Sequence, residues 1–151
     1  RPYAAILGCA DSRVPPNIIF DEGLGDLFVI RVAGNIVDNS VVGSLEFAVV
    51  KLQVPLIVVL GHQRCGAVEA AVRGADLPGL LSHTVRAIQP AAERVRNLPG
   101  DPLDNAIRAN VQLVTDQLCN SKPILADRTA SGQLKIVPAY YDLVNGQVEI
   151  L

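Results

Sequence analysis

Short, continuously apolar runs alternate along this chain with longer stretches that have helical periodicity. Runs of this length without polar positions are typical of strands that are covered on both faces. The dipeptide Asn145-Gly146 predicts a tight turn into a last strand, antiparallel to its neighbour. The pattern predicts five strands, at Tyr3–Gly8, Leu27–Val32, Leu56–Leu60, Leu134–Val137 and Gln147–Leu151.

Helical patterns occupy the segments between these strands. Apolar residues cover nearly the whole circumference of Ser40–Leu52, so we expect it to be buried on two sides, by its own sheet and by a second subunit. Pro90 should kink or split the segment in which it lies. The expected helices are Ser40–Leu52, Cys65–Arg73, Leu80–Asn97 and Leu103–Asn120. The alternation predicts an α/β fold, with a mostly parallel four-stranded sheet, an antiparallel edge strand and helices on both faces.

Composition narrows the class of protein. The chain has 151 residues, which fits a single domain, and half of them are hydrophobic, which excludes a disordered chain. Its net charge is −2 and it has no basic run, so we expect no nucleic-acid partner. No apolar run approaches the ~20 residues of a membrane span. Three widely separated cysteines and the lack of a leader pattern favour the cytoplasm, although the sequence does not fix the compartment.

Chemically active side chains follow two of the predicted strands. Cys9-Ala-Asp11-Ser-Arg13 comes directly after the first strand, and Gly61-His62-Gln-Arg-Cys65-Gly66 comes after the third. If these strands are neighbours in a parallel sheet, their carboxyl ends bring the two motifs together. Two thiolates, an imidazole and a carboxylate form a plausible tetrahedral zinc set. The sequence therefore predicts a zinc site made by Cys9, Asp11, His62 and Cys65.

Either motif by itself has a simpler explanation. A lone cysteine is more often a small buried hydrophobic residue, and a lone histidine more often a surface residue or a hydrogen-bonded core residue. A nucleotide-binding site is a third interpretation of an α/β sheet with glycine-rich turns. The turn at Gly61–Gly66 matches neither Gly-x-Gly-x-x-Gly nor a P-loop, which argues against nucleotide binding.

Taken together, the paired motifs resemble those of the β-class carbonic anhydrases. The similarity continues between them through Gly25–Asn35 and Ser44–Val49, and more loosely around Tyr140-Tyr141-Asp142. The resemblance implies that Cys9, His62 and Cys65 are the zinc ligands. It also implies carbon dioxide and bicarbonate as substrate and product.

The resemblance leaves two places for Asp11. Its carboxylate either fills the fourth zinc position or leaves that position to water. Arg13 would decide between them, because a bidentate pair with its guanidinium would draw Asp11 off the metal. Asp11 would then orient the zinc-bound hydroxide toward carbon dioxide. We interpret His83 as an exposed residue unrelated to the site rather than as a proton shuttle.

The family's substrate cleft is lined partly across a dimer interface, so the resemblance implies a homodimer or larger homo-oligomer. Phe28, Ala33 and Phe47 correspond to its apolar walls, and Gly66 lies where the family's backbone N–H binds the oxyanion. The two phenylalanines fit an ordinary core equally well, and the start of a helix would by itself explain Gly66. The family also carries a helical arm before the first strand. We expect residues 1–151 to be a single zinc-dependent domain that lacks this arm.

Two other functions on the same scaffold stay open. One is hydrolysis of carbonyl sulfide or carbon disulfide, which the walls of the cleft would decide. The other is a structural or regulatory zinc domain that has lost catalysis. Asp11 and Arg13 argue for an enzyme, because a purely structural Cys₂His site needs neither of them.

Overall fold

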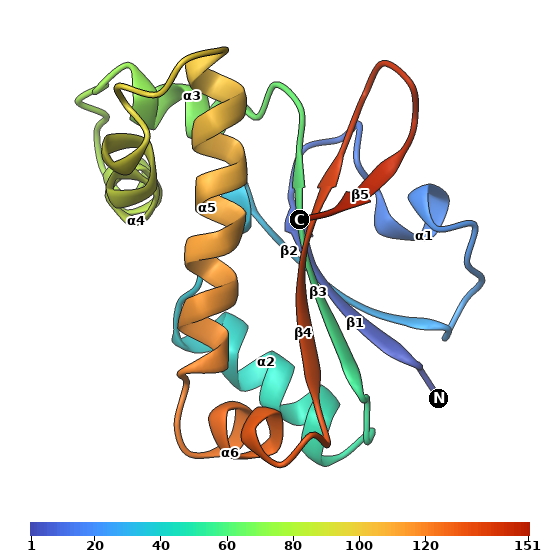
Figure 1. The fold of residues 1–151 in the computed structure, drawn as a ribbon. Coiled ribbons are helices and arrows are strands. Elements are labelled where there is room, and N and C mark those ends of the chain that lie inside the picture. The colour runs from blue at the N-terminus through green and yellow to red at the C-terminus, as the bar shows by residue number, and fades with distance from the viewer.

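A computed structural model describes residues 1–151, and its centre is one five-stranded sheet with the strand order β2-β1-β3-β4-β5. The strands are β1 (Ala4–Cys9), β2 (Leu27–Val32), β3 (Leu56–His62), β4 (Lys135–Tyr141) and β5 (Val148–Ile150). The first four are parallel, and β5 pairs with β4 in the antiparallel direction. The predicted α/β fold, with a mostly parallel sheet and an antiparallel edge, is confirmed (Figure 1).

Helices cover the two faces of this sheet unequally. The short α1 lies on one side, and the other labelled helices lie on the opposite side (Figure 1). None of them combines the length and apolar character needed to cross a membrane. The helices are α1 (Pro16–Ile19), α2 (Asn39–Val50), α3 (Gly66–Val72), α4 (Leu81–Arg94), α5 (Pro102–Cys119) and α6 (Ile124–Ala130), with a 3₁₀ turn at Ala33–Asn35.

Alternate side chains of strand β1 enter different cores. Ala5 and Leu7 pack in a cluster with residues of α2, α5 and α6, whereas Ala4 and Ile6 belong to a smaller cluster next to Ile19 of α1. All four of these residues are buried. Both faces of β1 are therefore covered, which explains why its sequence is continuously apolar.

The structure differs from the sequence-based elements at two prolines. Pro90 does not split its helix, since α4 is continuous from Leu81 to Arg94. The carbonyl that Pro90 leaves without a donor belongs to Arg86, which is exposed, so water can bond to it. Similarly, β4 continues through Pro138, whose carbonyl accepts a hydrogen bond from the Leu151 amide at 3.0 Å. The short helices α1 and α6 carry too little periodicity to be predicted.

Helix α2 begins at a side-chain cap and presents two different faces. The Asp38 carboxylate accepts a hydrogen bond from the Val41 amide at 2.9 Å. Leu45 and its neighbours on the inner face are fully buried against the sheet. On the other side Phe47 is 52% exposed and Val50 is 37% exposed. Within one chain, α2 is thus buried on a single side.

Candidate metal centre

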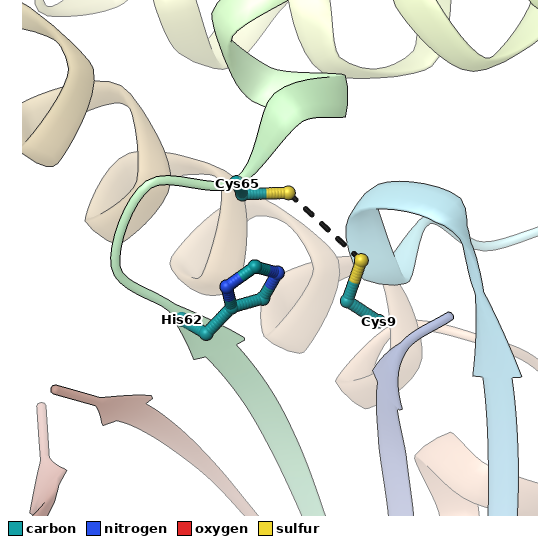
Figure 2. A group of neighbouring side chains, drawn as sticks. All are labelled: Cys9, His62 and Cys65. Carbon is teal, nitrogen blue, oxygen red and sulfur yellow. Dashed lines mark hydrogen bonds between the residues drawn. The ribbon is translucent and has the colours of Figure 1, made fainter. Parts of the chain in front are cut away.

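The centre forms where two neighbouring parallel strands end. Cys9 is the last residue of β1 and His62 is the last residue of β3, and these strands are paired over Gly8 and Leu60. Cys65 follows one turn later, at the N-cap position of α3. The strand order therefore brings residues from distant parts of the sequence to one edge of the sheet (Figure 2).

The three side chains converge on a single buried point. The sulfurs of Cys9 and Cys65 are 3.9 Å apart, and one ligand atom from each of Cys9, His62 and Cys65 lies within 4.8 Å of the others. All three residues are at most 4% exposed. Two sulfurs and one imidazole nitrogen are a donor set that suits zinc in tetrahedral geometry.

The ring of His62 is oriented for ligation through Nε2. Nδ1 lies 2.9 Å from the carbonyl oxygen of Gln63, a contact that assigns the proton to Nδ1 and leaves the lone pair on Nε2. Nε2 is buried and has no hydrogen-bond partner. A buried polar atom without a partner is costly, and a metal ion at this point would satisfy it.

The hydrogen bond between the two thiols shifts the pKa values of Cys9 and Cys65 in opposite directions. The bond from Cys65 lowers the pKa of Cys9 to about 4, helped by His62 and by the backbone N–H groups of Asp11 and Gly34, although burial opposes the shift. The same bond to Cys9, together with burial, raises the pKa of Cys65, against the opposing effect of the Ala67 and Val68 amides. The site thus favours a thiolate at Cys9, which is the form that binds metals.

Asp11 lies beside this group but is held by Arg13. Two nitrogens of the Arg13 guanidinium donate to the two oxygens of the Asp11 carboxylate, at 2.9 and 2.8 Å. This pairing holds the pKa of Asp11 well below its usual range, so the carboxylate stays ionised. Its Oδ2 is 4.0 Å from His62 Nε2, and Asp11 is not part of the close Cys-His-Cys group.

Arg13 also connects the two loops that carry the ligands. Its Nη2 donates to the backbone carbonyl of Arg64 at 3.1 Å, between His62 and Cys65. The loop after β1 is therefore tied to the loop after β3 by the same guanidinium that holds Asp11.

Arg31 of β2 is a site residue that the sequence did not single out. Its Nε donates to the carbonyl of Cys9 at 2.8 Å, and its Nη2 donates to the carbonyl of Asp11. A charged residue inside an otherwise apolar strand was the available signal, because such a residue needs specific partners. Arg31 fixes the backbone on which Cys9 and Asp11 stand.

The residues expected in a substrate cleft fall into two groups. Ala33 and Gly66 are exposed and adjoin the centre, since Ala33 precedes Gly34 and Gly66 follows Cys65. Phe28 and Phe47 stack on each other, with ring centroids 6.3 Å apart. The register pairs Phe28 with Ala5, which precedes Cys9 by four residues. Four residues of a strand span ~13 Å, so Phe28 lies about that far from Cys9 along the sheet. Within one chain the phenylalanines therefore lie apart from the centre.

His83 lies near the start of α4, where it is exposed, and it is not part of the Cys-His-Cys group. This position agrees with its interpretation as a surface residue.

Comparison with known proteins shows matches over nearly the whole chain. The family model described as "Carbonic anhydrase" matches residues 4–148. The chain is 42% identical to the carbonic anhydrase of Mycolicibacterium smegmatis, over 99% of this chain and 75% of the relative. It is equally similar to carbonic anhydrase 2 of Mycobacterium tuberculosis, over 97% of this chain and 73% of the relative.

Solved structures give the same picture. A tetrameric β-carbonic anhydrase from Sordaria macrospora superposes with a TM-score of 0.91 at 27% identity, covering 99% of this chain and 80% of that one. A Coccomyxa β-carbonic anhydrase in complex with acetazolamide gives a TM-score of 0.87 at 30% identity, covering 99% and 72%.

Proposed function

Because this chain belongs to the β-class carbonic anhydrase family, we propose that it hydrates carbon dioxide reversibly to bicarbonate and a proton at a zinc ion. The observation that carries the proposal is the convergence of Cys9, His62 and Cys65 on one buried point. Bound zinc would lower the pKa of a water molecule to ~7 and so supply a nucleophile at neutral pH.

One set of side chains would hold the metal, and a second set would orient the reactants. The sulfurs of Cys9 and Cys65 and Nε2 of His62 would hold zinc, with the Gln63 carbonyl keeping the His62 ring in position. The Arg13 pairing supports a fourth position open to water, because both oxygens of Asp11 are engaged. Asp11 would accept a hydrogen bond from the attacking water and aim its lone pair at the substrate carbon.

Zinc content and hydration rate, measured on the same samples, test this division. In Asp11→Ala we expect zinc content near that of the wild type and a fall in hydration rate of roughly 100-fold, measured by stopped flow. Asp127→Ala removes an exposed carboxylate from α6 and should change neither quantity. Unchanged hydration in Asp11→Ala would favour a structural zinc domain, and wild-type protein without zinc would refute the proposal.

The same samples separate the two hydrolase alternatives. Parallel assays with carbon disulfide and carbonyl sulfide should give rates far below those with carbon dioxide. A reversed order of rates would assign the scaffold to sulfide hydrolysis.

The substrate cleft is proposed to form between subunits. Ala33 and Gly66 would contribute from the chain that holds the metal, with the Gly66 amide facing the oxyanion. Phe28 and Phe47 would contribute from a second subunit, since they lie apart from the centre of their own chain and Phe47 is 52% exposed. We therefore expect a homodimer or larger homo-oligomer by light scattering. Phe47→Asp should shift it toward the monomer and lower the hydration rate, and a fully active monomer would contradict this arrangement.

We also propose that residues 1–151 act as one zinc-dependent domain in a reducing compartment such as the cytoplasm. The family match extends over 4–148, and all three cysteines are free, as thiolate ligands must be. Hydration by this stretch of chain alone, together with cell fractionation, tests both statements.

A further inference from the structure

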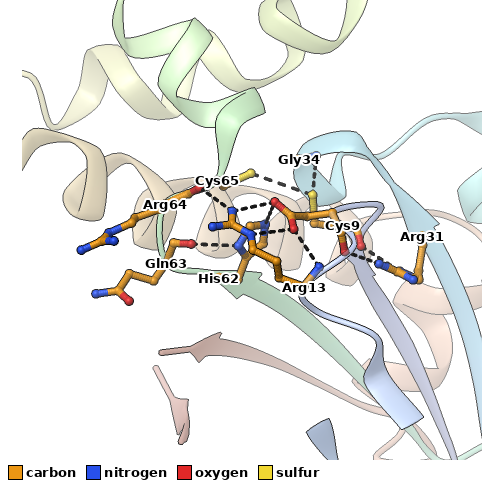
Figure 3. A network of polar contacts seen from close by, with 9 residues as sticks. Cys9, Arg13, Arg31, Gly34, His62, Gln63, Arg64 and Cys65 are labelled. Atoms are coloured by element: carbon orange, nitrogen blue, oxygen red, sulfur yellow. Dashed lines mark hydrogen bonds and ion pairs between the residues drawn. The ribbon is translucent and has the colours of Figure 1, made fainter. Parts of the chain in front are cut away.

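Helix α5 contributes one polar side chain to the interior near the metal centre. Asn110 is 1% exposed, and its Nδ2 donates a hydrogen bond to the backbone carbonyl of Gly34 at 3.0 Å, across 76 residues of sequence. Gly34 in turn uses its N–H to reach the sulfur of Cys9 at 3.3 Å (Figure 3). We propose that Asn110 is a positioning residue that acts through Gly34 on the metal-binding thiolate of Cys9. This inference rests on the zinc centre proposed above.

The turn that carries Gly34 needs to be held in place. Gly34 has φ +67° and the next residue, Asn35, has φ 43°, so two successive residues adopt the left-handed conformation. Glycine adopts this conformation without steric cost and asparagine tolerates it well, so the turn is allowed but flexible unless other contacts hold it. The Asn110 bond holds it at the carbonyl of Gly34.

Stability alone does not explain an asparagine at this position. The Oδ1 of Asn110 is buried without a partner, and so is Nδ2 of Asn35, the residue after Gly34. An unpartnered buried amide oxygen lowers the stability of the folded protein. The side chain of Asn110 makes one hydrogen bond, to the Gly34 carbonyl. An apolar residue of similar shape could not make this bond, so holding the Gly34 turn is what Asn110 adds.

The consequence for the sulfur follows from the direction of the Gly34 bond. An amide N–H donated to a thiolate stabilises the negative charge and reduces the electron density that the sulfur gives to a metal. Losing the Asn110 bond should free the Gly34 turn, so that the Cys9 sulfur is no longer held where it converges with His62 and Cys65. Outer partners of metal ligands typically affect affinity by 10–100-fold.

Metal affinity and a cobalt spectrum test the proposal without relying on activity. Asn110→Leu preserves the approximate shape and removes the donor. We expect its zinc affinity, measured by competition with a chromophoric chelator, to fall by about 10-fold. In the cobalt(II)-loaded protein, the thiolate-to-cobalt charge-transfer band should shift, because the donor strength of the sulfur has changed.

Thr115→Val is the matched control on the same helix. Thr115 is 4% exposed, and its hydroxyl donates only to the Val111 carbonyl one turn earlier, at 2.8 Å. This variant should lose some thermal stability and keep the wild-type affinity and cobalt band. If Asn110→Leu behaves as Thr115→Val does, Asn110 is purely structural and the proposal is wrong.

A second variant keeps the test decisive if Asn110→Leu does not fold. Asn110→Ser has a shorter donor that no longer reaches the Gly34 carbonyl, and it leaves room for water. It should shift the cobalt band in the same direction, and an unshifted band overturns the inference. Wild-type protein that binds neither zinc nor cobalt would instead refute the proposed function itself.

Discussion

Replacing Gly34 by alanine should destabilise this protein strongly, because two separate penalties coincide at one residue. The backbone there has φ +67°, which disfavours any side chain. An added Cβ would also lie 2.6 Å from Cδ1 of Ile88 and 3.2 Å from Cβ of Ala67. The first neighbour is the end of a flexible side chain and can move, whereas the second has no rotamer to change.

The two penalties give a magnitude. The left-handed conformation costs an alanine ~1–2 kcal/mol. Overpacking a well-filled core costs a further ~1–3 kcal/mol. The free energy of unfolding should therefore fall by about 2–5 kcal/mol, a large part of the ~5–15 kcal/mol available to a typical domain. At ~2–4 °C per kcal/mol for a chain of this size, the Tm should fall by about 4–20 °C.

A second glycine isolates the conformational penalty. Gly132 has φ +73°, and a Cβ added there would meet no atom within 4 Å, so Gly132→Ala carries only the backbone cost. Calorimetry should place the Tm of Gly34→Ala clearly below that of Gly132→Ala. Adding Ile88→Val removes the methyl group nearest the new Cβ, so the double variant should be less destabilised than the sum of the single variants. Equal Tm values for the two alanine variants would refute the steric part of the reasoning.

Three further outcomes are expected from other parts of the structure. Asp38→Ala removes the cap bond to the Val41 amide and should lower the free energy of unfolding by ~1 kcal/mol in urea titrations. Burial and the bond to Asp104 raise the pKa of Tyr140, so its contribution to stability is present below its unfolded pKa of 10.0 and is lost as the pH rises through the folded value. Tyr140→Phe should accordingly flatten the fall in Tm above pH 10.0, and an unchanged alkaline fall would exclude this origin. Zinc added to metal-free protein at ~100 times its Kd should raise the free energy of unfolding by ~2.7 kcal/mol, and an unchanged Tm would argue against a folded-state metal site.

Local patterns were sufficient for the framework of the fold. Each long strand is a run of apolar residues, so its existence depends on neighbours in sequence. The convergence of Cys9 with His62 and Cys65 followed from one topological rule, that the carboxyl ends of adjacent parallel strands share an edge. The sequence pattern could not show that β1 and β3 are neighbours. The strand order of the sheet shows that they are.

Contacts between distant segments of the chain could not be predicted from the sequence. Arg31 reaches the backbone of Cys9 and Asp11 only because β2 pairs with β1 in one register, and a shift of one residue would turn its side chain to the other face. Asn110 looks like any polar position of an amphipathic helix until α5 is packed on the sheet. Neither contact leaves a spacing signal in the sequence, since each joins segments brought together by folding.

These long-range contacts explain why Cys9 lies on an interior strand, β1, rather than on an edge strand of the sheet. β1 has β2 on one side and β3 on the other, so the loop after Cys9 can be held from both. Arg31 holds it from β2, and Arg13 ties it to the Arg64 carbonyl in the loop after β3. An edge strand would have allowed only one of these restraints. Since a ligand group must keep its geometry to within a fraction of an ångström to bind a small cation well, restraint from both sides is the physical reason for this position.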